Sequence, residues 1–403
     1  MKIIKKDGTV EGWNGEKIKE AVYKAAARVN QYVEPDVLNK LVEKVHSCLI
    51  INRDAPTKDL HKEVIHYLKY FGLTDVANSY QEYRDYKNTY AKSFEKVKDE
   101  ADNVLLLGDR ENANFDSSLV STKGSLIKGY LTKELYRQFY LSKEEKELTK
   151  RGDIYIHDMR DMLMGSVNCC LFDIGNVLRG GFSMSNVDYT EPTSVLSALQ
   201  VIGDITLVAT AQQFGGFSLS QLDMVLLPYC HKTLEKAYEH AKHSFPDEGR
   251  FAWVAYSKDT LKNELKQGFQ SLELKLNTVP CSRGDFAFTT ISFGCWNAPQ
   301  WLGRSLTNKD LWILKEICEA ILTTRMNGHG ENHKPVVFPK LVYLYEENCL
   351  SAFQEARDVF ELAIECSSKC MYPDFLSLTG DWAHSSVGKQ YMENKQVVTP
   401  MGA

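Results

Sequence analysis

The sequence predicts an α/β protein that begins with a smaller, mainly helical domain. The length of 403 residues exceeds what one hydrophobic core usually supports. The first part pairs a short strand hairpin with helical periods, whereas after residue 120 short strand-like runs alternate with long helical ones. We therefore expect a first domain over residues 1–95, a linker over 96–120 and a larger domain over 121–403.

The first domain is expected to place two strands against four helices. Alternation predicts a strand from Lys2 to Lys6, a turn at Asp7-Gly8 and a returning strand from Thr9 to Trp13. Asn14 is a suitable N-cap for the first helix. Helices are expected from their apolar spacing over residues 15–30, 34–50, 57–72 and 74–94.

The larger domain shows the alternation that is typical of an α/β fold. Helical periods cover residues 131–152, 194–214 and 227–245, and strand-like runs cover residues 153–158, 285–294 and 336–345. The helix over 194–214 is apolar almost all round, which predicts burial in a core or a subunit interface.

Composition excludes several classes of protein. The 48 basic and 53 acidic residues give a net charge of -5 without a basic block, so nucleic acid is not an expected partner. No window reaches the roughly 20 apolar residues of a membrane span, and the N-terminus does not resemble a signal peptide. Ten scattered cysteines are typical of reduced thiols, and a cytoplasmic location is expected.

The N-terminal hairpin carries lysines beside a glycine turn and the start of a capped helix. Such an arrangement can cradle a triphosphate, because backbone N–H groups and ammonium charges both attract phosphate. Lysines on a hairpin are more commonly just solvated, so the pattern alone leaves both interpretations open.

The run K-K-D-G-x-x-E-x-x-N-x-x-K-I, the later P-T-x-x-L-H and a tyrosine-rich helix resemble the ATP-cone, the allosteric module of ribonucleotide reductases. The resemblance implies ATP and dATP as effectors. It implies a binding site made of Lys5, Lys6, Glu11, Asn14, Lys17, Thr57, His61 and Lys87. Lysines suit phosphate, while Glu11 and Asn14 can hydrogen-bond base or sugar. Without the resemblance, His61 would be taken for a helix-surface residue.

The segment Asn168-Cys169-Cys170-Leu171 ends an apolar run, where a cysteine is more often a packing residue than a catalyst. Together with the preceding I-H-D, with TAQQFGGFSLSQLD, FTTISFG and the terminal TPMG, it resembles the anaerobic, glycyl-radical class of ribonucleotide reductase over nearly the whole chain. The resemblance implies that the larger domain is the first part of a ten-stranded α/β barrel of the glycyl-radical enzyme type.

In that family a thiyl radical on a loop cysteine abstracts the 3′-hydrogen of a ribonucleoside triphosphate, and a second cysteine on the first barrel strand donates reducing equivalents. Cys169 matches the second cysteine, and Cys170 is expected to point the opposite way. The thiyl cysteine would follow T-P-M-G, where this chain has Ala403, which carries no S–H. Met401 matches a methionine beside it, a polarizable contact in the formate-dependent radical pathway.

The resemblance further implies formate as reductant, a radical S-adenosylmethionine activase and a homodimer. A glycyl radical and zinc are expected only in a missing C-terminal half, so this chain alone is expected to be inactive. A split gene, an intein at the catalytic codon and a simple truncation are left open as explanations. The rival hypothesis is a catalytically dead regulator that senses nucleotides.

Two further motifs superficially suggest a metal. Cys366 and Cys370 lie four positions apart without a partner pair, which predicts a helix face. His329, Glu331 and His333 lie among glycines and a proline, which predict a loop and not a helix with ligands on one face. No metal site is expected in this chain.

Overall fold

The computed structural model describes residues 1–5, 8–50, 54–106, 116–165, 167–184, 186–213, 215–281, 284–294, 296 and 304–379. The chain divides into two compact units, Met1–Asp99 and Glu100–Ala403. Each unit buries an apolar cluster of its own. Among the described residues, none of the helices combines the length and the apolar content needed to cross a bilayer.

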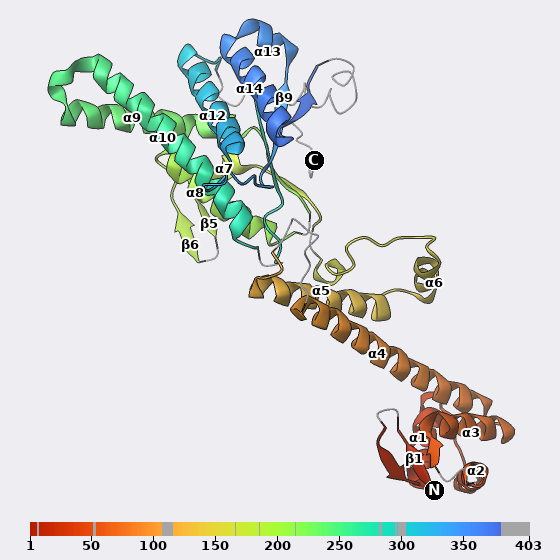
Figure 1. The fold of residues 1–403 in the computed structure, drawn as a ribbon. Helices are drawn as coiled ribbons and strands as arrows, with labels where there is room; N and C mark the ends of the chain where they lie inside the picture. The colour runs from red at the N-terminus through yellow and green to blue at the C-terminus, as the bar shows by residue number, and fades with distance from the viewer. Residues whose placement is uncertain are drawn as a thin grey trace. The chain divides into compact units, whose positions relative to one another are not determined.

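The first unit packs a small sheet against helices (Figure 1). Strand β1 (Lys2–Ile4) pairs antiparallel with β2 (Val10–Gly12) and parallel with β3 (Asp54–Pro56). The helices are α1 (Gly15–Arg28), α2 (Pro35–Leu49), α3 (Thr57–Tyr70) and α4 (Thr74–Leu106). Val22, Leu41 and Val64 are fully buried in its core. The two strands and four helices predicted here are confirmed.

Two features of this unit differ from expectation. Strand β3 was not predicted, because its sequence Asp-Ala-Pro has low strand propensity and it pairs with β1 across two intervening helices. Helix α4 continues to Leu106, through the first part of the segment 96–120 that was expected to be a linker. The domain boundaries themselves stay a prediction.

The second unit is built on a parallel five-stranded sheet, which confirms the α/β class. Its strands are β4 (Cys170–Phe172), β7 (Phe217–Leu219), β8 (Thr289–Phe293), β9 (Lys340–Tyr345) and β10 (Asp374–Ser377). They follow the order β10-β9-β8-β7-β4, and all neighbours are parallel. Each strand thus lies beside the previous one, without the reversal of order seen in doubly wound sheets. Such an order is the one found within α/β barrels.

The second unit also contains helices, and those that follow β4 in the chain pack against the core of the sheet. The helices of the unit are α5 (Val120–Phe139), α6 (Lys143–Arg151), α7 (Ile174–Leu178), α8 (Val195–Thr210), α9 (Leu222–Ser244), α10 (Gly249–Thr278), α12 (Asn308–Asn327), α13 (Glu347–Ala352) and α14 (Gln354–Cys370). The hairpin of β5 (Phe182–Met184) and β6 (Val187–Tyr189) lies before α8. Helices α9 and α10, which follow β7 and precede β8 in the chain, lie side by side (Figure 1). Buried side chains of the strands and helices form one apolar cluster. It includes Phe217, Ile291 and Leu341 from the strands and Leu199 and Ile317 from the helices.

Two predicted elements of the second unit are wrong in detail. The single helical run over 131–152 is divided between α5 and α6, because Ser142 forms a capping box with Glu145 that starts a new helix. The run 153–158 is not a strand. Residues 154–156 belong to no regular element, and Asp158 has a φ of 50° in the turn that follows.

Candidate functional site

The hairpin and the first helix bring three of the predicted effector residues together. Lys5 Nζ lies 2.6 Å from Glu11 Oε1, and Lys17 Nζ lies 2.9 Å from Glu11 Oε2. The hydrogen bonds from Lys5 and Lys17 lower the pKa of the Glu11 carboxyl. Two ammonium groups therefore converge on one carboxylate at the surface, with positive charge in excess.

Asn14 builds the helix start beside this cluster. Its Oδ1 accepts hydrogen bonds from the backbone N–H groups of Glu16, at 3.0 Å, and Lys17, at 3.3 Å. The cap fixes the N-terminus of α1, where the aligned peptide dipoles present partial positive charge. The side-chain oxygen of Asn14 is thus engaged with the helix, and its contact with a nucleotide stays a prediction.

Thr57 and His61 lie one turn apart on α3. The Thr57 hydroxyl donates to the carbonyl oxygen of Ile4 at 2.8 Å, which ties the start of α3 to the end of β1. His61 Nδ1 lies 2.5 Å from the hydroxyl oxygen of Tyr80 on α4. Burial, and to a smaller extent the charge of Arg84, lowers the pKa of His61 to about 3. His61 is therefore neutral at pH 7.

Lys87 lies apart from this lysine cluster. Its Nζ is 5.1 Å from the ring centroid of Tyr83, which also has the Arg28 guanidinium carbon at 4.1 Å. Among the contacts of the described residues, none joins Lys87 to Lys5 or Lys17. Lys6 lies outside the described residues.

Sequence reasoning did not single out Tyr80 and Arg84. Burial raises the pKa of Tyr80 to about 12 and lowers the pKa of Arg84. The two residues lie four positions apart on α4, so they share a helix face. That spacing, combined with a histidine on the preceding helix, could have indicated the cluster.

Cys169 lies directly before β4, against the turn that leads into β7. Its Sγ accepts a hydrogen bond from the backbone N–H of Gly216 at 3.3 Å. The Gly215 N–H donates to the Asn168 carbonyl oxygen at 2.6 Å, and the Cys170 N–H donates to the Gly216 carbonyl oxygen at 3.0 Å. The sulfur is thus held where two parallel strands begin.

Cys170 has different surroundings. It packs against the core cluster, and burial raises the pKa of its thiol. The two neighbouring cysteines therefore have different environments, although their catalytic roles stay predictions. Met401 and Ala403 lie outside the described residues.

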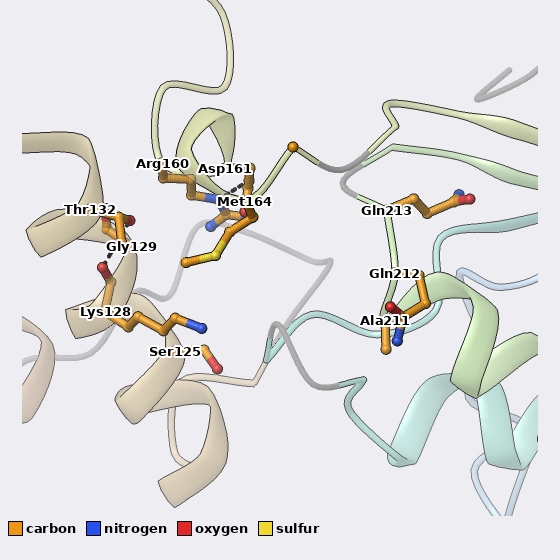
Figure 2. A pocket seen from close by; sticks show the side chains of 11 residues that line it. Ser125, Lys128, Gly129, Thr132, Arg160, Asp161, Met164, Ala211, Gln212 and Gln213 are labelled. Atoms are coloured by element: carbon orange, nitrogen blue, oxygen red, sulfur yellow. Dashed lines mark hydrogen bonds and ion pairs between the residues drawn. The ribbon is translucent and has the colours of Figure 1, made fainter. Parts of the chain in front are cut away.

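A pocket of about 410 Å³ lies near this turn (Figure 2). Lys128 and Thr132 of α5, Arg160 and Met164 of the following segment, and Gln213 after α8 are among the residues that line it. Arg160 donates to Asp161 at 3.0 Å and to Asp285 at 3.2 Å, so its charge is already paired. Nothing in the sequence analysis indicated this pocket, because its walls come from three separate segments.

The two motifs that suggested a metal have other contacts. His329 Nε2 lies 2.9 Å from Glu273 Oε2, and His333 Nδ1 lies 2.7 Å from the Asn327 carbonyl oxygen. Cys366 and Cys370 lie on α14, as their spacing predicted. Burial raises the pKa of Cys366 to about 12. Among the described residues, no group of three or more His, Cys, Asp or Glu side chains could hold a metal ion.

Comparison with known proteins identifies a protein family for each of the two units. Residues 111–403 match the profile of the family described as anaerobic ribonucleoside-triphosphate reductase, and residues 1–89 match the ATP cone domain. The chain is 31% identical over 393 residues to the anaerobic ribonucleoside-triphosphate reductase of Haemophilus influenzae, covering 93% of this chain and 52% of that protein. The Escherichia coli protein of the same name is 29% identical over 384 residues, covering 93% and 51%.

Among solved structures, the anaerobic ribonucleotide reductase from Thermotoga maritima in complex with dATP and CTP matches with a TM-score of 0.47 and 17% identity. That match covers 74% of this chain and 50% of the other. The chain spans about half the length of the curated relatives it matches. Because the family profile covers most of it, the chain belongs to the anaerobic ribonucleoside-triphosphate reductase family.

Proposed function

We propose that this chain is the N-terminal part of an anaerobic ribonucleoside-triphosphate reductase that is regulated by ATP and dATP. The match of residues 111–403 to the reductase family carries the proposal. The match of residues 1–89 to the ATP cone domain supports the regulatory part. The reaction would convert a ribonucleoside triphosphate to its 2′-deoxy form, with the 2′-hydroxyl leaving as water and formate oxidised to carbon dioxide.

In the effector site, the phosphates of ATP or dATP would bind at Lys5 and Lys17, with Lys6 and Lys87 as further cations. Both lysines are paired with Glu11 in this structure, so phosphate binding has to compete with that carboxylate. His61 is neutral at pH 7 and would contact the nucleotide through a hydrogen bond or its ring, not through charge. Asn14 and Thr57 would complete the site.

In the reductase unit, Cys169 would supply reducing equivalents at the 2′-carbon. The thiyl radical would require a cysteine at position 403, beside Met401, where this chain has alanine. The glycyl radical, a zinc site, a radical S-adenosylmethionine activase and dimerisation are further parts of the proposal. The radical and the zinc would lie in the part of the related proteins that this chain does not span. We also propose a cytoplasmic location.

Reconstitution tests this proposal. The chain and its Ala403→Cys variant would each be combined with the remaining half of a relative, an activase, S-adenosylmethionine and formate under anaerobic conditions. We expect a glycyl radical by electron paramagnetic resonance in both, and deoxynucleotide formation only with Ala403→Cys. Regaining a covalent route should change the rate by several orders of magnitude. A radical without turnover in the cysteine variant, together with ATP binding, would favour a nucleotide-sensing regulator instead.

A further inference from the structure

We propose that Gln213 is a positioning residue for Cys169. Its side-chain amide holds the Gly215-Gly216 turn so that the Gly216 N–H points at the cysteine sulfur. The importance of that contact for nucleotide reduction rests on the proposed reductase function, whereas the contact itself does not.

The amide of Gln213 binds both carbonyl groups of the turn. Its Nε2 donates to the Gly215 carbonyl oxygen at 3.1 Å and to the Gly216 carbonyl oxygen at 2.7 Å. The side chain is buried, with 3% of the residue exposed. Since a buried amide loses most of its rotational freedom and both bonds use the same nitrogen, the two carbonyls are fixed relative to each other.

The other side of the turn faces the cysteine. The Gly216 N–H donates to Cys169 Sγ at 3.3 Å, in a place where a regular parallel ladder would offer a backbone carbonyl oxygen. The Gly215 N–H donates to the Asn168 carbonyl oxygen at 2.6 Å. A sulfur that accepts a hydrogen bond from one side directs its own S–H elsewhere, so the turn sets the direction of the thiol.

The turn is also shaped to admit the sulfur at close range. A Cβ added at Gly215 would lie 2.5 Å from Cys169 Sγ and 2.3 Å from Asn168 Oδ1, distances that real side chains do not tolerate. A glycine is therefore required at 215 by close approach. Figure 2 shows the Gln213 side chain turned away from those of Lys128 and Arg160, in keeping with the two hydrogen bonds that it donates to the turn.

The chain offers a selective way to observe this contact. Gly181 and Gly216 are the two glycines that follow another glycine in the sequence. In deuterated protein, glycine is labelled with carbon-13 at its carbonyl and with nitrogen-15 at its amide. A spectrum that detects only amides preceded by a labelled carbonyl then shows two signals, those of Gly181 and Gly216. Cys169→Ala should move the Gly216 signal and leave the Gly181 signal in place, which assigns both.

The test is Gln213→Met, which keeps the volume but removes both donors. We expect the Gly216 amide proton to shift and its hydrogen exchange to accelerate at least tenfold, with Gly181 unchanged. Gln213→Asn keeps the amide but is one methylene shorter, and it should give the same result. It replaces Gln213→Met in the test if the methionine variant does not fold. Gln200→Met, at an exposed position of α8, is the matched control and should affect neither glycine.

In the reconstituted enzyme with cysteine at 403, Gln213→Met should lower kcat at least tenfold with little change in KM, because substrate binding is not altered. An unchanged Gly216 signal in both Gln213 variants overturns the inference, and so do equal changes at Gly181 and Gly216. If Gly216 responds selectively while the parent enzyme has no turnover, the positioning of Cys169 stands and the proposed function fails.

Discussion

His61 and Tyr80 form a neutral hydrogen-bonded pair between α3 and α4, with His61 Nδ1 2.5 Å from the phenolic oxygen. Burial lowers the pKa of His61 to about 3 and raises the pKa of Tyr80 to about 12. Arg84 lies close enough to oppose a positive charge on the imidazole. The pair therefore stays uncharged over the whole physiological range of pH.

Acid should weaken the first unit through His61. The unfolded chain binds a proton at His61 near pH 6.5, and the folded chain only near pH 3. Between these values the unfolded state holds more protons, so stability falls as pH falls, by at most about tenfold in the opening constant per pH unit. Hydrogen exchange of residues 57–70 from pH 7 to pH 4 measures this. His61→Phe should flatten the dependence, and an equal slope in both proteins would contradict the assignment.

Lys17→Ala should weaken ATP binding by about tenfold to a hundredfold, because a charge-assisted hydrogen bond to phosphate is lost. Lys19→Ala is the control, since Lys19 lies on the same helix but is not one of the predicted effector residues. Titration calorimetry of the full chain with ATP and with dATP gives both affinities. Equal affinities for the two variants would remove Lys17 from the effector site.

Cys169→Ser and Cys170→Ser should have different effects in the reconstituted enzyme. The first should abolish deoxynucleotide formation, because the thiol that donates reducing equivalents is gone. The second should leave turnover measurable but destabilise the fold by roughly 1–3 kcal/mol, since Cys170 packs against the core and a hydroxyl is poorly accommodated there. Activity assays with thermal unfolding separate the two outcomes. Equal loss of activity would leave Cys169 without a distinct role.

Glu273→Gln should destabilise the second unit by about 3–5 kcal/mol. Glu273 and Arg325 are buried and joined at 3.0 Å, and His329 contacts the other carboxylate oxygen at 2.9 Å. The neutral amide leaves the guanidinium buried without its counter-charge. Urea unfolding followed by circular dichroism measures the change. Glu365→Gln, which removes an exposed pair with Lys369, should leave the transition in place.

Much of the fold was predictable because its signals are local. Patterns within residues 15–30, 34–50 and 57–72 each indicated a helix, and Val22, Leu41 and Val64, one from each of these helices, are buried in the first unit. Helix α10 was not predicted. It buries Ser257 and Glu273 along with leucines, which obscures the apolar period.

The candidate sites also divide into contacts that the sequence order predicts and contacts that depend on the tertiary fold. Lys5, Glu11 and Lys17 lie within one hairpin and the helix after it, so their proximity follows from the sequence order. Cys169 and Gly216 meet only because β4 and β7 pair in parallel, although α7, the β5–β6 hairpin and α8 lie between them in the chain. A hydrogen bond that depends on such pairing has no signal in the sequence alone.

The strand order of the main sheet has a consequence for how the chain behaves by itself. Within the part of the chain that the structure describes, β4 and β10 stand at the two ends of the order, and each is bonded on one side only. Their outer backbone donors and acceptors form templates for another extended segment. One such segment would pair with the backbone groups of one edge strand. A curved partner sheet could pair with both edge strands and close the barrel. Without either, edge-to-edge association between copies is the aggregation route that this architecture favours.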